Sequence, residues 1–297
     1  MTEVPTEDAT IGVLSVDKPL ELTSHDVVQK VRRLADIRRV GHAGTLDPLA
    51  TGVLVLALGR ATRLLEYVVA LPKTYEARVR MGQISNTYDG EGEIVEERPV
   101  TVGGADIEAA LEQFRGTIEQ VPPMYSAIRK GGQRLYELAR KGVEVQREAR
   151  EVTVYNLTLE RWEPPDATLR VVCSTGTYVR SLAHDLGQAL GCGAYLAGLR
   201  RTAVGSFTAA GATPLDALTA ETWRTHLQGA DAAVQHLPRL DVSQDAAVRL
   251  AQGQWLPQGA EEPDADLVRA YDPAGRFVGV VAAENEQWRP RKILYRP

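Results

Sequence analysis

The feature that most constrains this chain is a twelve-residue segment, GHAGTLDPLATG, at residues 41–52. It contains three glycines and a proline in twelve residues, so it predicts a loop rather than a helix or a strand. Glycines permit positive φ angles and the close approach of a ligand. Asp47 lies in this loop. Between two buried strands its carboxylate can face a cleft, although Asp followed by Pro is also common in ordinary turns.

The surrounding residues predict strands and helices in mixed order. Apolar runs indicate buried strands at residues 11–16 and 53–58, and Thr23 or Ser24 can cap a helix that starts near His25. Further strands are expected at residues 74–81, 151–161, 168–173 and 199–207, further helices at 63–67, 106–114, 135–140 and 178–190, and a mobile polar loop at 83–97. Because strands and helices do not alternate strictly, the pattern favours an α+β fold with a large, mixed, mostly antiparallel sheet flanked by helices.

The length and the composition predict two domains. A chain of 297 residues exceeds the ~150 residues of an average domain about twofold. After about Leu240 the composition changes to short apolar runs at residues 267–271, 277–282 and 292–295, separated by Gly, Pro and acidic residues. We therefore expect a main domain at residues 1–239 and a small β-barrel-like module at residues 240–297.

Cysteine, histidine and the N-terminus exclude several classes of protein. Cys173 and Cys192 have no CxxC spacing, which argues against a disulfide scaffold or a zinc site, and the five histidines show no metal-ligand spacing. The N-terminus is polar, and no apolar run reaches the ~18 residues of a membrane span. These features predict a cytoplasmic protein without a metal site or a membrane anchor.

The net charge of −5 hides an uneven distribution of charge. Basic residues gather at residues 127–141 and in three arginine pairs, and acids gather at residues 89–97 and 261–266. The basic residues are Arg129, Lys130, Arg134, Arg140 and Lys141, with Arg32/Arg33, Arg38/Arg39 and Arg200/Arg201. Such segregation permits a basic groove on an acidic protein. From charge alone, ordinary solvated faces are the favoured interpretation.

Three further segments carry candidate functional residues. Tyr75, on an expected strand, could be a platform for a nucleobase or an ordinary core tyrosine. Arg180, at the start of an expected helix, could pair with a buried carboxylate or a phosphate, or lie on the surface. The rigid segment at residues 122–127 could contact RNA or connect packed elements. Phosphate-binding loop, dinucleotide-binding, GxSxG and HExxH motifs are absent from the sequence.

Taken together and in order, these segments resemble the TruB family of tRNA pseudouridine synthases over residues 12–207. The resemblance runs through VDKP at 16–19, GHAGTLDPLATG at 41–52, KTY at 73–75, PPMYSA at 122–127, GTYVR at 176–180 and LRR at 199–201. It implies the pseudouridine synthase fold followed by a C-terminal RNA-binding module of the PUA type. It also implies isomerisation of uridine 55 in the TΨC loop, by cleavage of the N1–C1′ bond, rotation of the base and reattachment through C5, without a cofactor or a metal.

The resemblance also implies roles for individual residues. Asp47 would be the catalytic aspartate, Arg180 would pair with it and keep it charged, and Tyr75 would stack on the target base and could help to remove the C5 proton. His42 would fill the place of the extruded base. Flipping costs a few kcal/mol in lost stacking, which stacked side chains partly offset.

The remaining expected site residues surround the uridine. Tyr178 and Leu199 would line its pocket, and Asp89 would lie near the active site. The expected partner is the T-arm of tRNA, bound by a monomer without an obligate protein partner. Two alternatives stay open: a protein that remodels tRNA without chemistry, and a nucleoside or glycoside hydrolase that uses Asp47. A hydrolase usually needs a second carboxylate, for which Asp89 is the candidate.

Overall fold

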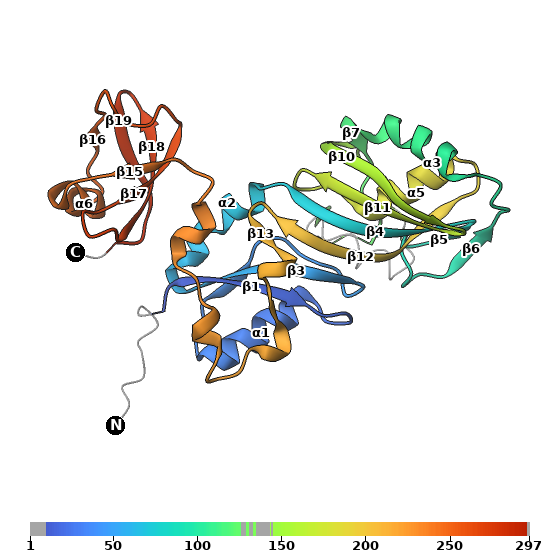
Figure 1. Cartoon of the computed structure of the whole chain (residues 1–297), viewed down its shortest axis with the longest axis horizontal. Coiled ribbons are helices and arrows are strands. Elements are labelled where there is room, and N and C mark those ends of the chain that lie inside the picture. Colours follow the sequence, from blue (N-terminus) through green and yellow to red (C-terminus); the bar gives the residue numbers. More distant parts are fainter. Residues whose placement is uncertain (1–9, 126–128, 131–132, 135–142, 144, 296–297) are drawn as a thin grey trace.

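The computed structural model describes residues 10–125, 129–130, 133–134, 143 and 145–295 (Figure 1). Its main body is built on a ten-stranded sheet with the order β14-β1-β3-β12-β4-β11-β10-β7, to which β2 and β13 add at β3 and β12. The strands are β1 (Gly12–Lys18), β2 (Val40–His42), β3 (Ala50–Leu58), β4 (Lys73–Met81), β7 (Gly116–Gln120), β10 (Arg150–Glu163), β11 (Asp166–Cys173), β12 (Ala194–Val204), β13 (Phe207–Thr208) and β14 (Thr213–Pro214). Only the β1–β14 and β3–β12 pairs are parallel within this described sheet. The expected mixed, mostly antiparallel sheet is confirmed.

Helices cover this sheet as the apolar patterns predict. They are α1 (Ser24–Ala35), α2 (Leu65–Ala70), α3 (Gly104–Leu111) and α5 (Val179–Ala189), with short 3-10 turns η1 (Gly59–Leu64), η2 (Glu112–Phe114), η3 (Ala209–Gly211), η4 (Leu215–Ala217), η5 (Trp223–His226) and η6 (Ala230–Val234). Thr23 caps α1, since its hydroxyl accepts a hydrogen bond from the Asp26 amide while the Asp26 carboxylate accepts one from the Thr23 amide.

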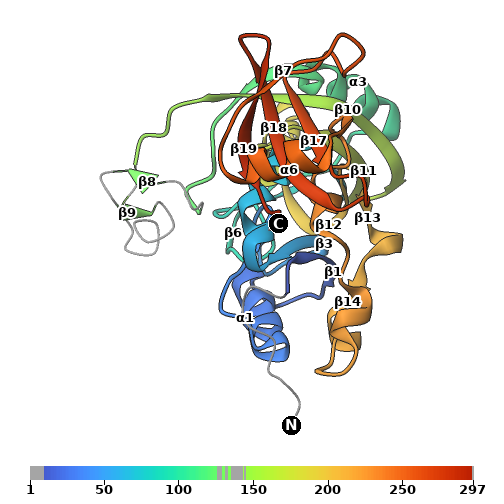
Figure 2. The same ribbon diagram turned by 90° about the vertical axis from the view of Figure 1, so that its left-hand side faces the viewer.

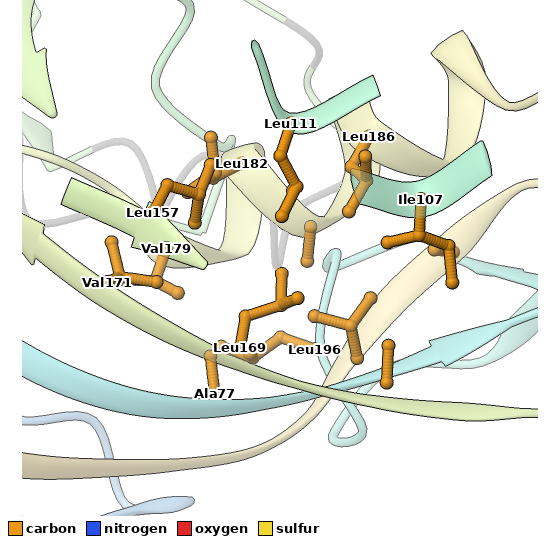
Figure 3. Close-up of a cluster of buried hydrophobic side chains, with 14 of the residues drawn as sticks. Ala77, Ile107, Leu111, Leu157, Leu169, Val171, Val179, Leu182, Leu186 and Leu196 are labelled. Carbon is orange, nitrogen blue, oxygen red and sulfur yellow. The ribbon is translucent and has the colours of Figure 1, made fainter. Parts of the chain in front are cut away.

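Two core clusters meet on one face of the sheet, at its centre. Near one end, side chains of β1 and β3 pack against α1; toward the other end, β4 and β11 pack against α3 and α5 (Figure 3). Tyr75 on β4 and Leu199 on β12 contact both clusters. The opposite face of β1 and β3 is covered by α2 and η6 through residues such as Val13 and Val53. The middle of the sheet, where the two clusters meet, is therefore where Tyr75 and Leu199 lie.

The C-terminal residues form a second sheet with its own core (Figure 1). It contains β15 (Arg239–Asp241), β16 (Leu256–Pro257), β17 (Leu267–Tyr271), β18 (Phe277–Glu284), β19 (Gln287–Ile293) and the helix α6 (Gln244–Ala251). Val280 and Leu294 pack into the core of the main body, and Lys292 lies 2.6 Å from the Glu66 carboxylate. The small C-terminal β module is thus confirmed, whereas a boundary between residues 239 and 240 stays a prediction.

Several expected elements differ from the structure. The prediction of a mobile loop at residues 83–97 is wrong, because β5 (Gln83–Ser85) and β6 (Ile94–Glu97) pair there and Ser85 and Asp89 are buried. The helix at 63–67 is replaced by η1 followed by α2, and β19 ends at Ile293. The helix expected at 135–140 lies outside the described residues. Figure 2 shows the short hairpin of β8 (Arg129–Lys130) and β9 (Gln133–Arg134) standing away from the main sheet.

Candidate active site

Helix α1 and the segment after β1 hold the loop that carries Asp47 in place. The Ser24 hydroxyl accepts a hydrogen bond from the Leu46 amide at 2.8 Å, and the Glu21 amide donates to the Pro48 carbonyl at 2.9 Å. Leu46 is buried in the core beside α1. At Gly52, where φ is +101°, a Cβ atom would lie 2.2 Å from the Arg201 carbonyl, so only glycine permits this approach of β3 to β12. Buried Leu46 on one side and the close approach at Gly52 on the other restrict the conformation of residues 47–51, which include Asp47.

The Asp47 side chain projects from this loop toward Arg180. Its carboxylate Oδ2 lies 3.1 Å from Arg180 Nη2, while 45% of the side chain is exposed. The expected pairing of these residues is confirmed as geometry. The Asp47 backbone carbonyl accepts a hydrogen bond from the Ala50 amide at 3.0 Å, which closes a turn and leaves the carboxylate half-exposed.

Arg180 joins two carboxylates from distant parts of the chain. Its Nη1 lies 3.0 Å from Asp89 Oδ2, and its Nη2 also donates to the Tyr125 carbonyl at 2.8 Å. Only 10% of the Arg180 side chain and 5% of the Asp89 side chain are exposed. Asp89 Oδ1 accepts hydrogen bonds from the Thr87 hydroxyl at 2.6 Å and from the Glu91 amide at 3.1 Å. A planar guanidinium suits this bridging role, since separate nitrogens reach separate carboxylates.

Tyr75 and Leu199 lie on adjacent strands, β4 and β12, in the middle of the sheet. Tyr75 is paired in register with Arg201, and Leu199 with Ala77, so these side chains share one face of the sheet. Burial raises the pKa of the Tyr75 hydroxyl, the charge of Arg201 opposes that rise, and the Asp47 carboxylate adds to it. Tyr75 therefore stays protonated at physiological pH, as a neutral aromatic surface within the electrostatic reach of Asp47.

His42 is the last residue of β2, so the start of the loop predicted at residues 41–52 is a strand, as is its end at Ala50–Gly52 in β3. His42 is half-buried, and burial lowers its pKa, with the Arg201 cation acting in the same direction and the Gly44 backbone against it. A neutral imidazole can stack on a base without a desolvated charge.

Tyr178 precedes α5, where its backbone amide and carbonyl bind the side-chain amide of buried Gln120 at 2.7 and 3.0 Å. That clamp fixes the start of the helix that carries Arg180.

Lys18 is a residue that the pattern of the sequence did not mark as functional. Its side chain is fully buried, and Nζ donates to the carbonyls of Pro19 and Leu22 at 2.8 and 2.6 Å. Burial lowers the pKa of Lys18 to about 8, while the nearby Asp47 carboxylate opposes that shift. Lys18 thus places a buried cation close enough to Asp47 to act on it. The available signals were its position at the end of an apolar strand and its place in the VDKP segment at residues 16–19.

The structure assigns structural roles to the Arg200/Arg201 pair. Arg200 binds Asp17 through two hydrogen bonds of 2.7 and 3.0 Å. Arg201 is buried and donates to the carbonyls of Val53 and Gly44. The side chains of the basic residues expected at 127–141 lie outside the described residues. In the described part of the chain, no three His, Cys, Asp or Glu side chains gather closely enough to hold a metal ion, and no helix is long and apolar enough to cross a membrane.

Comparisons with known proteins agree with this arrangement. Residues 32–179 match the TruB family pseudouridylate synthase N-terminal domain, residues 180–243 the tRNA pseudouridylate synthase B C-terminal domain, and residues 237–294 the tRNA pseudouridine synthase II C-terminal domain. The tRNA pseudouridine synthase B of Pseudomonas aeruginosa is 46% identical over 295 residues, covering 95% of both chains. The enzyme of the same name from Cupriavidus metallidurans is 46% identical and covers 95% of this chain and 94% of its own.

Solved structures give the same result at greater distance. A chain of the archaeal box H/ACA sRNP superimposes with a TM-score of 0.72 at 27% identity, covering 96% of this chain and 86% of that one. A chain of an H/ACA RNP bound to a substrate RNA containing 2′-deoxyuridine gives a TM-score of 0.72 at 26% identity, covering 96% and 85%. Identity of this extent, over nearly the whole of both chains, means that this chain belongs to the TruB family of pseudouridine synthases, and that it is an enzyme.

Proposed function

We propose that this enzyme converts uridine 55 in the TΨC loop of tRNA to pseudouridine, with Asp47 as the catalytic carboxylate. The observation that carries the proposal is the bridge from Arg180 to both Asp47 and Asp89, with Tyr75 within the electrostatic reach of Asp47. The names of the bacterial relatives supply tRNA as the substrate. The choice of uridine 55 rests on the family resemblance of the loop at residues 41–52.

The proposed reaction is an isomerisation and needs no added reactant. The bond between N1 of the uracil and C1′ of the ribose breaks, the base rotates, and C5 bonds to C1′; C5 then loses a proton while N1 gains one. Positive charge develops on the sugar during cleavage, and a carboxylate stabilises such charge. Asp47 is half-exposed and already paired with Arg180, so it can meet the ribose without leaving the array. Whether Asp47 attacks the sugar, attacks the base, or removes a proton from the sugar stays open in this proposal.

The other site residues receive roles consistent with their surroundings. Tyr75 is a neutral ring at the centre of the sheet and would stack on the flipped uracil, while Leu199 and Tyr178 would line the pocket. His42, kept neutral by burial, would occupy the space that the base leaves in the T-loop. Each stacked base contributes about 1–3 kcal/mol, which offsets part of the cost of flipping.

The test is tritium release from unmodified tRNA labelled with [5-³H]uridine, because formation of the C5–C1′ bond frees the hydrogen on C5. The wild-type protein should release one equivalent, and Asp47→Asn should release tritium about 10³-fold more slowly while binding tRNA with unchanged affinity. A matched tRNA with cytidine at position 55 should release nothing with either protein. Release that persists with this tRNA would refute the assignment of uridine 55, although not pseudouridine formation itself.

The same assay separates the two alternative functions. Liberation of free uracil would identify a hydrolase, since the isomerase keeps the base attached to the chain. Tight tRNA binding without tritium release from the wild-type protein would favour a protein that only remodels tRNA. We further propose that the enzyme acts in the cytoplasm as a monomer, without an obligate protein partner. Sedimentation of the protein alone and with tRNA tests the monomer.

A further inference from the structure

An aromatic contact links the loop that carries Asp89 to the helix that carries Arg180. The rings of Tyr88 and His184 stack with their centroids 3.8 Å apart and an angle of 12° between their planes. Tyr88 directly precedes Asp89. His184 follows Arg180 by four residues on α5, and residues at that spacing lie on the same face of a helix. The stack and the Arg180–Asp89 ion pair therefore connect the same two elements, side by side.

The backbone of Tyr88 is held in a conformation that few side chains adopt. Its φ is +67°, in the left-handed region, which is sparsely populated by residues other than glycine. Its amide donates to the Ser85 carbonyl at 3.2 Å, and its carbonyl accepts from the Leu196 amide at 3.0 Å. With both backbone groups bound, the direction of the Tyr88 ring is set by the loop, and this direction leads to His184.

The position of Asp89 relative to Arg180 depends on more than their own ion pair. The hydrogen bonds from Thr87 and Glu91 fix the Asp89 carboxylate within its own loop and do not tie it to α5. Arg180 Nη1 is 3.0 Å from Asp89 while Nη2 is 3.1 Å from Asp47. A shift of the loop against α5 would therefore be passed through the rigid guanidinium to Asp47.

We propose that Tyr88 and His184 are positioning residues whose stacked rings hold the Asp89 loop against α5, so that Arg180 meets Asp47 in the reactive orientation. The inference rests on the function proposed above, because it concerns the geometry of the same array. It assigns no contact with RNA to either ring. Burial and the nearby Arg98 cation lower the pKa of His184, so the imidazole that stacks on Tyr88 is neutral at physiological pH and adds no charge beside Arg180.

The test separates the ring from the unusual backbone. Tyr88→Asn removes the ring but keeps a residue that tolerates positive φ, whereas Tyr88→Phe keeps the ring and removes only the hydroxyl. His184→Ala and His184→Phe do the same from the helix side. Tyr155→Asn is the matched control, because Tyr155 is a 58% exposed tyrosine on β10 outside the array. Tritium release gives kcat and KM for each variant, and filter binding gives the Kd for tRNA.

Tyr88→Asn and His184→Ala should each lower kcat roughly tenfold and leave KM and Kd within about twofold of wild type, because the lost interaction acts on the reacting array. The double variant should be no slower than the slower single variant, as expected for two residues that act through one contact. Tyr88→Phe and His184→Phe should restore most of kcat, and Tyr155→Asn should match wild type.

Three results would overturn the inference: wild-type kcat in Tyr88→Asn, a Phe variant as slow as the Asn variant, or a weaker Kd with unchanged kcat. The last result would mean that the rings bind RNA. If Tyr88→Asn does not fold, the comparison of His184→Ala with His184→Phe decides the same question. Absence of tritium release from the wild-type protein would refute the proposed function instead, and is thus distinguishable.

Discussion

The two carboxylates that meet at Arg180 come from loops of opposite character. Asp47 lies in a short segment between β2 and β3 that contains Gly44 and Pro48, and 45% of its side chain is exposed. Asp89 lies in a polar segment between β5 and β6, and 5% of its side chain is exposed. The loop that looks like a site in the sequence presents its carboxylate to solvent, whereas the loop that looks mobile holds its carboxylate in the interior.

The difference lies in what holds each loop. The Asp47 loop is held by hydrogen bonds from nearby α1 and the segment after β1, and buried Leu46 anchors it in the core. The Asp89 loop is held by a distant strand: the Gly90 amide donates to the Leu196 carbonyl and the Leu196 amide to the Tyr88 carbonyl. The sequence predicts a mobile loop here, because the strand that binds this polar segment lies about a hundred residues further along the chain. In the function proposed above, the exposed carboxylate of Asp47 carries the chemistry and the buried carboxylate of Asp89 orients Arg180.

The largest expected effect is that of Asp47→Asn on turnover. Loss of the reacting charge should lower kcat by about 10³-fold, the upper end for a single charge-stabilising group. The free energy of unfolding should change by less than ~0.5 kcal/mol, because the side chain is half-exposed. Tritium release and urea unfolding measure both. A large loss of stability would instead show that Asp47 is a structural residue, like Asp89.

Arg180→Lys should have the next largest effect. A single ammonium cannot replace two guanidinium nitrogens that contact separate carboxylates, so kcat should fall by roughly 10²-fold, as for a misplacement of about 1 Å at the reacting centre. Affinity for tRNA, measured by filter binding, should stay within about threefold of wild type. Unchanged kcat would mean that charge alone, without the bridge, is sufficient.

Lys18 sharpens the comparison, because it places a buried cation beneath the Asp47 loop. Its pKa of about 8 in the folded state lies below the ordinary 10.5, so the folded protein releases this proton while the unfolded chain retains it. The contribution of Lys18 to stability therefore increases as the pH rises from about 8 to about 10.5. Relative to Lys18→Met, the wild type should gain about 2 kcal/mol between pH 7.5 and 9.5, measured by urea unfolding at each pH. A constant difference between the two proteins would contradict the burial of the charged amine.

Asp89→Asn should act more weakly on turnover than Asp47→Asn but more strongly on stability. Asparagine can still accept a hydrogen bond from Arg180, so kcat should fall about tenfold. The free energy of unfolding should fall by roughly 1–3 kcal/mol, because the variant leaves a buried cation with one charged partner fewer. If Asp89→Asn were as inactive as Asp47→Asn and equally stable, the two carboxylates would not have the different roles proposed for them.

The smallest effect is expected on the outer strand of the hairpin that carries Asp89. Val95 on β6 is 61% exposed, so Val95→Thr should change stability by less than ~0.5 kcal/mol and leave kcat unchanged. Thermal unfolding and tritium release test this. A larger change would show that the hairpin is held by β6 rather than by its contacts with β12.

The sequence by itself determined the elements whose signals are local. The cap at Thr23, the strand that carries Tyr75 and the helix that begins after Tyr178 follow from capping chemistry and the spacing of apolar residues. The loop predicted at residues 41–52 is confined to residues 43–49, because both of its ends pair in strands β2 and β3. The resemblance of these segments to one family indicated the fold, the enzyme class and the pairing of Asp47 with Arg180.

Only the tertiary structure decided the rest. It buried Asp89 rather than Asp47, converted Arg200 and Arg201 into structural residues, and stacked Tyr88 on His184. These outcomes depend on pairs of residues far apart in the chain. Burial and ion pairing depend on which surfaces the sheet brings together. The spacing of residues along the sequence does not encode how close such surfaces lie in the folded protein.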